Sequence, residues 1–383
     1  MTTDKKDRIP NAPVLRFPEF ADGWKECELK DIAQISKGSG ISKDQLSETG
    51  KPCVLYGELY TKYKSEVITE ILSKTNLEES HMVYSRENDV IIPSSGETAV
   101  DISTARCVPF DNILLGGDLT IIRLKEQDGR FFSYQLNGVR KLDIARIAQG
   151  VSVVHLYGDN LKRLKVTFPT IAEQNKISVF LSLVDKRIET QSRAIEDLKQ
   201  LRLALYQRVF TNLQGDSVSL KSVADVIKGN QINGDELSEN GKYYVMNGGV
   251  LPSGYYDEFN TPANTISISE GGNSCGYVQF NEEPFWSGGH CYTLQVCKTI
   301  NVRYLFHYLK YKEQDIMKLR IGSGLPNIQK KDLEHFMVVI PNTNKQQKLT
   351  SLFDCIQIKE NIEKALLSQW QIQKRYLLQK MFI

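Results

Sequence analysis

Residues 29–57 read LKDIAQISKGSGISKDQLSETGKPCVLYG, and residues 220–248 read LKSVADVIKGNQINGDELSENGKYYVMNG. The two stretches align without a gap, from Leu29 with Leu220 to Gly57 with Gly248, and 14 of their 29 positions are identical. The chain therefore carries one module twice. Two large repeats predict pseudo-twofold symmetry, because a solenoid needs three or more short units.

The duplication extends beyond this stretch. GVSVVHLYGDNLKRLKVTFPTIAEQNKIS at 150–178 corresponds to GSGLPNIQKKDLEHFMVVIPNTNKQQKLT at 322–350, with Gly150 aligned to Gly322 and Pro169 to Pro341. LGGDLTII at 115–122 lines up with SGGHCYTL at 287–294 in the same register. The repeated unit is thus a domain and the segment that follows it. The second domain is the shorter of the two, through differences in its loops.

A long helix is predicted after each domain. In the first copy, Thr170 and Glu173 form a capping-box pattern that places the helix start, and neither Pro nor Gly occurs from 171 to 210. About 38 residues of helix give a rod of roughly 57 Å. Gln191 and Arg202 interrupt an otherwise apolar heptad seam. The predicted seam comprises Ile177, Leu181, Val184, Ile188, Ile195, Leu198, Leu205 and Val209.

The C-terminal copy, KQQKLTSLFDCIQIKENIEKALLSQWQIQKRYLLQKMFI, also lacks Pro and Gly. Its less regular seam runs through Leu349, Phe353 and Ile356 and then shifts to Ile362, Leu366, Trp370 and Leu377. A long helix cannot bury an apolar stripe alone. We expect the two helices to bury their stripes against each other, although each could instead pack on its own domain.

The predicted fold class is α+β, with two similar mixed α/β domains separated by two long antiparallel coiled-coil helices and related by pseudo-twofold symmetry. Short helices are predicted over 29–38 and 220–229, ending at Gly38 and Gly229. β-Rich stretches with Gly- and Ser-rich loops follow them. The predicted boundaries are a tail at 1–19, a first domain at 20–168, a helix at 169–212, a second domain at 213–340 and a helix at 341–383.

Composition excludes several classes of protein. No apolar run is long enough to span a membrane and the opening MTTDKKDRIPNAPVLRFPEF lacks a signal-peptide core, so we expect a cytoplasmic protein. Seven cysteines without a C-x-x-C pair argue against a disulfide framework, and Cys291 and Cys297 are expected to pack in the core. The five histidines show no metal-ligand spacing, so no metal site is predicted. The net charge of +2 permits a nucleic-acid partner through local basic patches without requiring one.

A search for catalytic motifs finds none. There is no Pro-Pro pair to hold a flipped base, no phosphate-binding G-x-x-x-x-G-K-[ST] loop, no G-x-S-x-G elbow and no H-E-x-x-H helix. The Gly38-x-Gly40 pair is only half of a dinucleotide fingerprint, and Gln231 replaces its second glycine in the other repeat. We therefore expect a chain without an active site of its own.

Loops rich in recognition groups occur at matching places in both domains. Small Gly and Ser residues allow close backbone approach, while Asn, Gln, Glu, Ser and Lys can read base edges and Lys and Arg can bind phosphates. Solvated turns are the alternative reading of each loop. The candidates in the first domain are Lys37, Tyr60, Lys62, Tyr63, Lys64, Ser94, Ser95, Glu97, Thr98, Arg146, Gln149 and Ser152. Those in the second are Lys228, Asn230, Gln231, Asn233, Glu270, Asn273, Ser274, Arg320 and Ser323.

The chain resembles the specificity subunit of type I restriction–modification systems over nearly its whole length. The motifs that carry this resemblance are LRFPEFADGWKECELKDIAQISKG, IIPSSGETA…LLGGDLTII, ISEGGNSCGYVQF…EPFWSGGHCYTLQ and FPTIAEQNKISVFLSLVDKRI. The C-terminal echo departs from the pattern, because NTNKQQKL replaces TIAEQNKI, and this leaves the register of the second helix open.

The resemblance implies that each domain is a target recognition domain that reads one half of an interrupted sequence in double-stranded DNA. It implies that the helices fix the spacing and dock two methyltransferase subunits, which motor–nuclease subunits join. S-adenosylmethionine, ATP and Mg would then be bound by partner subunits and not by this chain. Two other classes stay open on the residues alone: a coiled-coil adaptor between proteins, and an enzyme with an unrecognised site.

Overall fold

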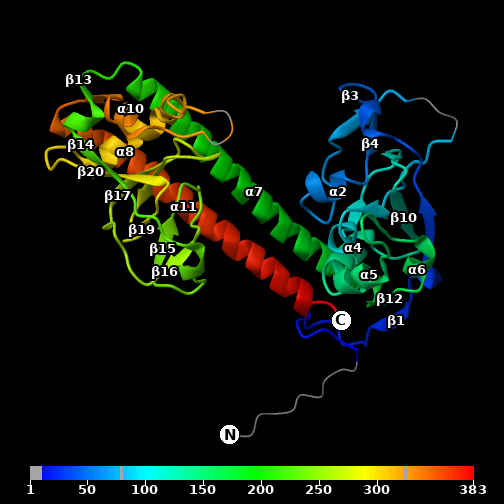
Figure 1. The fold of residues 1–383 in the computed structure, drawn as a ribbon. Helices are drawn as coiled ribbons and strands as arrows, with labels where there is room; N and C mark the ends of the chain where they lie inside the picture. The colour runs from blue at the N-terminus through cyan, green and yellow to red at the C-terminus, as the bar shows by residue number, and fades with distance from the viewer. Residues whose placement is uncertain (1–10, 78–80, 323, 325) are drawn as a thin grey trace, which may run out of the picture. The chain divides into compact units, whose positions relative to one another are not determined.

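The computed structural model describes residues 11–77, 81–322, 324 and 326–383. The chain divides into two compact units. Unit 1 contains the chain up to Ser192 together with Ala365–Ile383, and unit 2 contains Arg193–Lys364. Each of the two long helices therefore contributes one half to each unit (Figure 1). No described helix is long and apolar enough to cross a membrane.

Unit 1 is built around a four-stranded antiparallel sheet in the order β2-β10-β6-β8. A smaller sheet, β3-β5-β4-β9, and the pairs β1-β12 and β7-β11 complete it. The strands are β1 Lys25–Glu28, β2 Ala33–Lys37, β3 Leu46–Ser47, β4 Lys51–Val54, β5 Ser73–Thr75, β6 Asp89–Pro93, β7 Ser95–Gly96, β8 Arg106–Val108, β9 Leu114–Leu115, β10 Leu119–Leu124, β11 Val154–His155 and β12 Lys165–Phe168. The short helices are α1 Leu29–Ile32, η1 Lys43–Gln45, α2 Glu58–Thr61, α3 Ala99–Ile102, α4 Gly129–Asn137, α5 Lys141–Ile147 and α6 Gly158–Lys162.

Unit 2 repeats this plan. Its main sheet has the order β14-β20-β17-β18, the pair β13-β21 corresponds to β1-β12, and β16-β15-β19 forms its smaller sheet. The strands are β13 Asp216–Ser219, β14 Ala224–Lys228, β15 Tyr243–Met246, β16 Gly254–Tyr256, β17 Thr265–Ser269, β18 Val278–Asn281, β19 Trp286–Ser287, β20 Cys291–Val296 and β21 Met337–Ile340. The short helices are η2 Leu220–Ser222, η3 Gly234–Glu236, α8 Val302–Tyr311, α9 Glu313–Met317 and α10 Lys330–Glu334.

The short helices predicted over 29–38 and 220–229 are wrong in extent. Only the first turn is helical in each copy, as α1 and η2, and the rest forms β2 and β14. Each strand pairs along its length with a largely buried strand, β10 or β20, so the sheet overrides local helix propensity. Gly38 and Gly229 are consequently not helix C-caps but the residues that follow these strands.

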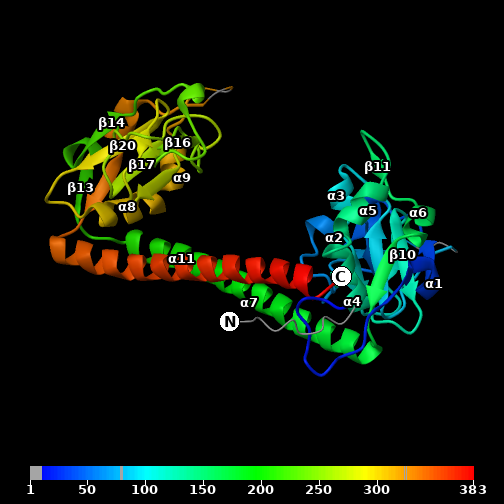
Figure 2. The same cartoon turned by 90° about the horizontal axis from the view of Figure 1, so that it is seen from below.

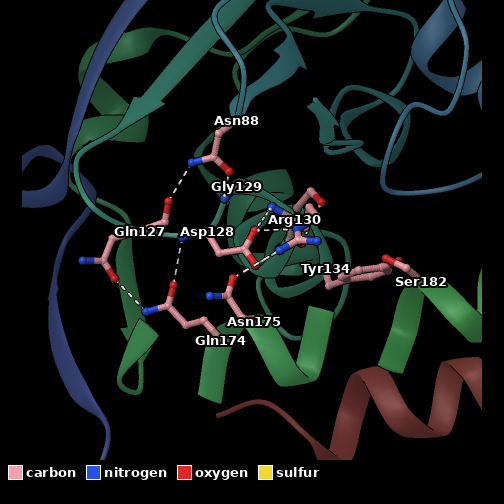
Figure 3. Close-up of polar contacts among 10 residues, drawn as sticks. Asn88, Gln127, Asp128, Gly129, Arg130, Tyr134, Gln174, Asn175 and Ser182 are labelled. Atoms are coloured by element: carbon pink, nitrogen blue, oxygen red, sulfur yellow. Dashed lines mark hydrogen bonds and ion pairs between the residues drawn. The ribbon is translucent and has the colours of Figure 1, made fainter. Parts of the chain in front are cut away.

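The long helices are α7, Ile171–Phe210, and α11, Thr343–Lys380. Gln174, in the first turn of α7, accepts the backbone N–H of Asp128 at 3.0 Å (Figure 3). It also donates to the Pro169 carbonyl at 2.9 Å. In unit 2, Gln346 makes the same two bonds, with Asn301 and Pro341, at 2.9 Å each. Since Asp128 and Asn301 are the N-cap residues of α4 and α8, each clamp ties the start of a long helix to its own domain. The Glu173 carboxylate, expected to cap α7, instead accepts from Arg16 and Trp24.

Each long helix ends in the core of the unit in which the other begins. The end of α11 places Phe382 against Trp24 and Phe131 in unit 1. The end of α7 places Phe210 among Tyr308 and Phe353 in unit 2. Phe210 and Phe382 are equivalent positions of the sequence repeat. Both cores are thus completed by an aromatic side chain from a distant helix end.

The predicted seam residues differ in their burial. Ile177, Leu181, Val184, Ile195, Leu349 and Phe353 are buried, while Ile188, Leu198, Leu205, Val209 and Ile356 are partly buried. Ile362 and Leu366, expected to continue the seam, are 54% and 43% exposed. In both units the helix halves contact each other as well as the domain, so both packing alternatives occur together.

One polar interruption of the predicted seam, Arg202, and a second cation, Lys374, form buried ion pairs between the helices. Arg202 on α7 bonds Glu360 on α11 at 2.7 Å in unit 2. Lys374 on α11 bonds Asp185 on α7 at 2.5 Å, and also Glu66, in unit 1. Burial alone would lower the pKa of Lys374, but Glu66 and Asp185 raise it, so the ammonium stays charged. The two cations, Arg202 and Lys374, are again equivalent positions of the repeat.

Removing an aromatic helix end should destabilise the unit that it completes. We expect Phe382→Ala to cost about 3–5 kcal/mol of unfolding free energy, the range typical of buried Phe truncations. Urea unfolding followed by circular dichroism would measure the loss. Tyr376→Ala, at a half-exposed position of the same helix, is the control and should change stability by under about 0.5 kcal/mol. Equal stability of the two variants would contradict this packing.

Buried His307 should make stability depend on pH. Its Nδ1 lies 2.8 Å from the Tyr206 hydroxyl and its Nε2 lies 2.8 Å from Asp354. Burial lowers the pKa of His307 despite the opposing effect of Asp354. The unfolded chain then binds a proton more readily than the folded one, so stability is present above the unfolded pKa of about 6.5 and falls as the pH drops below it.

We expect His307→Gln to flatten the decline in unfolding free energy between about pH 7.5 and pH 5.5. His335→Gln, at an exposed position, should leave the decline as in the parent chain. Urea unfolding at each pH would compare the three proteins. A His307→Gln decline as steep as that of the parent would show that His307 is not the titrating group.

Candidate nucleic-acid interface

The candidate loops extend from one backbone frame that both units share. Gly38 N–H donates to the Leu119 carbonyl at 2.9 Å, and Gly229 N–H donates to the Cys291 carbonyl at 2.8 Å. The residue after β6, Ser94, and the residue after β17, Glu270, likewise make matching backbone bonds. Ser94 N–H donates to Asp118 and its carbonyl accepts from Leu156. Glu270 N–H donates to His290 and its carbonyl accepts from Ile328.

In unit 1 this frame brings two predicted loops together. β7 pairs with β11 so that Ser95 lies opposite His155, and Gln149 bridges His155 through two backbone bonds. The loop at 93–98 (PSSGET) and the loop at 146–152 (RIAQGVS) are therefore neighbours. Figure 2 shows β11, α3 and α5 gathered at one end of the unit. Thr98 caps α3 by accepting from Asp101 N–H, which fixes the loop between β7 and this helix.

In unit 2 the corresponding loops also meet. Asn327 bridges both Gly271 and Ile321, so the loop at 269–274 (SEGGNS) lies beside residues 320–322. Lys228, the first residue of the loop at 228–233 (KGNQIN), donates to the Glu270 carboxylate at 2.6 Å. Tyr292 donates to the same carboxylate oxygen at 3.0 Å. Burial, together with this bond, raises the pKa of Tyr292, so its hydroxyl keeps the proton that it donates.

The candidates in unit 1 differ in their exposure. Lys37, Glu97, Thr98, Arg146, Gln149 and Ser152 are exposed, whereas Ser94 and Ser95 are buried and Tyr60 is half-buried. Ser94 bonds Thr120 internally, so its hydroxyl serves the fold. Burial, Tyr56 and the Asp101 and Glu97 carboxylates raise the pKa of Tyr60.

The segment Lys62–Lys64 is not brought to these loops. Lys62 bonds Glu58 at 2.6 Å, and Tyr63 is buried with its hydroxyl accepting from Leu72 N–H. All three side chains line a cavity of about 230 Å³ that Asp185 and Lys374 of the long helices also line. Tyr63 is thus a residue of the fold, and the charge of Lys62 is offset by Glu58.

In unit 2 the candidates divide in the same way. Lys228, Asn230, Gln231, Asn233, Asn273 and Arg320 are exposed, Ser274 is intermediate and Glu270 is buried. Ser323 lies outside the described residues. Asn233, the N-cap residue of the turn η3, donates its side-chain amide to the Glu236 carboxylate at 3.0 Å. A surface cavity of about 520 Å³ adjoins Lys228, Asn230 and Asn260.

Sequence reasoning missed several polar residues at this surface. They are His155, Asn260, His290, Tyr292 and Asn327, which strand pairing and the loop bonds bring to the candidate loops. The signal for two of them was present in the sequence. His290 and Tyr292 directly follow Gly288-Gly289, which aligns with Gly116-Gly117 in the first repeat.

The shared glycines allow close backbone contact at the base of the loops. A Cβ atom on Gly38 would lie 2.1 Å from the Gly116 carbonyl oxygen, and one on Gly229 would lie 2.3 Å from the Gly288 carbonyl oxygen. Such contacts are shorter than any side chain tolerates. The glycines are therefore required by the frame, whatever the loops recognise.

Cysteines add no chemistry to this surface. All seven are free; Cys291 is buried, and burial raises its pKa to about 11. Cys297 is exposed, so the prediction that it packs in the core is wrong: β20 ends at Val296 and Cys297 begins the turn that follows. Within the described ranges, no group of three or more His, Cys, Asp and Glu residues could hold a metal ion.

Comparison with known proteins identifies the family. The model of the type I restriction modification DNA specificity domain matches residues 21–200 and again residues 215–369. The chain belongs to this family and carries two copies of its domain. The two matches cover the two halves of the repeat read from the sequence.

Curated relatives agree. A Mycoplasma pneumoniae protein described as a type I specificity subunit is 34% identical over 140 residues, which are 36% of this chain and 37% of that protein. The specificity subunit of the type I restriction enzyme MjaVIII from Methanocaldococcus jannaschii is 22% identical over 94% of this chain and 93% of its own length. The chain thus matches about a third of the first relative and nearly all of the second.

Solved structures share the fold. The crystal structure of a type I restriction–modification S subunit from M. genitalium superposes with a TM-score of 0.69 at 21% identity, covering 97% of this chain and 99% of that one. A chain from a structure of type I complex assembly and conformational transition gives 0.57 at 16% identity, covering 96% and 98%. The arrangement of two similar mixed domains with two long helices is therefore that of known S subunits.

Alanine at the frame glycines should disturb the interface. We expect Gly38→Ala and Gly229→Ala each to cost about 1–3 kcal/mol of unfolding free energy through overpacking against backbone. Gly40→Ala and Gly234→Ala are matched controls, because nothing lies within 4 Å of a Cβ atom at either position. Urea unfolding would rank the four variants. Controls as destabilised as the frame variants would refute the close-contact explanation.

Proposed function

We propose that this chain is the sequence-reading subunit of a type I restriction–modification complex. Each unit reads one half of a bipartite site in double-stranded DNA, and the chain itself catalyses no reaction. One observation carries this proposal: the two units share a backbone frame but present different side chains from it. Positions with the same backbone bonds hold Ser94 in unit 1 and Glu270 in unit 2. Two domains that recognise different half-sites need a shared backbone frame that carries different side chains.

The exposed candidates have the chemistry of base and phosphate recognition. Glu97, Gln149, Asn230, Gln231 and Asn273 offer the acceptors and donors that distinguish base edges in the major groove. Lys37, Arg146 and Arg320 offer positive charge to phosphates. When two domains that each bind DNA weakly are joined in one chain, binding of one domain raises the effective concentration of the other at the DNA. The affinity of the whole chain for its site increases as a result.

Each unit also has a groove at equivalent positions of the long helices. The helix residues of the unit 1 groove are Asp185, Ile188, Glu189, Ser192 and Lys374, and those of the unit 2 groove are Gln357, Glu360, Asn361, Lys364 and Arg202. The two sets correspond residue by residue in the register of the sequence repeat. Repeated surfaces can bind two copies of one partner. This supports the docking of two methyltransferase subunits on the chain. Motor–nuclease subunits would then join the complex.

The cofactors of the complex would lie outside this chain. S-adenosylmethionine would be bound by the methyltransferase subunits, and ATP and Mg by the motor–nuclease subunits. The chain would work in the cytoplasm, where the DNA and these partners are.

An exchange of one domain tests the proposal. We expect that replacing residues 20–168 with the matching domain of another family member changes one half of the methylated sequence and leaves the other half as it was. Mapping methylated adenines in cells that carry the complete complex would read both halves. If both halves stay the same, or no bipartite sequence is methylated by the parent complex, the proposed function is wrong.

A further inference from the structure

Lys37 and Lys228 occupy equivalent places in the two units. Each is the last residue of the edge strand of the main sheet, β2 or β14. Lys37 lies opposite Thr120 in the register with β10, and Lys228 lies opposite Tyr292 in the register with β20. Both side chains are exposed at the base of the candidate loops. Their surroundings differ.

In unit 2 a buried carboxylate holds the lysine. Glu270 is only 8% exposed, and its Oε1 accepts from Lys228 Nζ at 2.6 Å and from the Tyr292 hydroxyl at 3.0 Å. Its Oε2 is buried without a hydrogen-bond partner in the described part of the chain and lies 3.9 Å from His290 Nδ1. Lys228 is thus the main cationic partner of this carboxylate, while its own side chain remains 53% exposed.

In unit 1 the carboxylate is missing. Ser94 takes the place of Glu270, and its hydroxyl lies 2.7 Å from that of Thr120, so the two close a neutral, buried pair. This pair offers Lys37 no carboxylate. Across residues 11–77, 81–322, 324 and 326–383, the Lys37 ammonium has no ion-pair partner.

This difference changes what each lysine can recognise. The negative charge of Glu270 offsets that of Lys228, which weakens attraction to a phosphate. The Lys228 ammonium, which has three N–H groups, keeps two for a ligand and is held in one place by the bond to Glu270. A positioned ammonium suits the O6 and N7 acceptors of guanine in the major groove. The charge of Lys37, which no described carboxylate offsets, suits a phosphate.

We propose that Lys228, positioned by Glu270, reads a guanine in the half-site bound by unit 2, and that Lys37 binds backbone phosphate in unit 1. The inference rests on the proposed function and adds a residue and a base to it. It also explains the buried carboxylate: an ionised group at this depth is costly unless a cation is paired with it. Glu270 is a positioning residue, since it acts on DNA only through Lys228.

Two matched variants separate these roles. In the complete complex, Lys228→Met should relax one guanine position in the half-site of unit 2 and cut discrimination there by about 5- to 150-fold. Lys37→Met should leave every position of the methylated sequence unchanged, weaken binding to all sites alike and reduce the salt slope of binding by about one. Mapping methylated adenines reads the first effect, and titration of duplex DNA at several salt concentrations reads the second.

Two further variants test the positioning. Glu270→Gln should relax the same guanine position as Lys228→Met, because the amide no longer holds the ammonium by charge. Lys228→Arg should retain guanine, since Arg binds the same two acceptors. The half-site of unit 2 is the one that survives exchange of residues 20–168.

The inference is overturned if Lys228→Met leaves the sequence preference intact, or if it weakens all sites alike as a phosphate contact would. Either result would leave the proposed function standing, because the parent complex would still methylate a bipartite sequence. Absence of such a sequence in the parent would instead refute the proposed function.

Discussion

The structure depends on the burial of two helix ends, each in a core built mainly by another part of the chain. Phe210 fills the core of unit 2 and Phe382 fills the core of unit 1. The glutamine clamps hold the beginnings of the same helices on the opposite units, through Gln174 and Gln346. Neither unit is therefore complete without both helices. This makes the helix pair part of both cores and not a linker between finished domains.

Buried charge adds specificity to that packing. Apolar seam residues would tolerate several alignments of two helices, whereas an ion pair is satisfied in one. Arg202 with Glu360, and Lys374 with Asp185, each require a particular turn of α7 to face a particular turn of α11. Breaking one such pair leaves an uncompensated buried charge, which costs more than the pair itself contributes. Arg202, an interruption of the heptad pattern, is thus a feature of the pairing, as is Lys374.

The sequence predicted the duplication, the two long helices and the loops that the frame brings together, because repeats and heptads are local patterns. It failed where tertiary contacts decide. The β2 and β14 segments look helical until strand pairing is known, and Ile362 and Leu366 continue the stripe but are 54% and 43% exposed. The sequence also could not predict which buried polar groups bond each other. Glu270 and Tyr292, for example, are brought together only by the pairing of strands in the sheet. Whether the exposed candidates touch DNA stays a prediction.

The frame and the side chains on it obey different constraints, and this allows two readers to diverge. Backbone bonds such as those of Ser94 and Glu270 do not depend on the side chain, so the loops keep their course when the residues change. Gly38 and Gly229 are more restricted, because a Cβ atom at either position would overlap a carbonyl oxygen. Near these glycines, unit 1 carries the neutral pair Ser94 and Thr120, whereas unit 2 carries Glu270 bonded to Lys228 and Tyr292. The main sheet has the same plan in both units. A duplicated domain of this design can acquire a new preference in one copy while the other copy keeps its own.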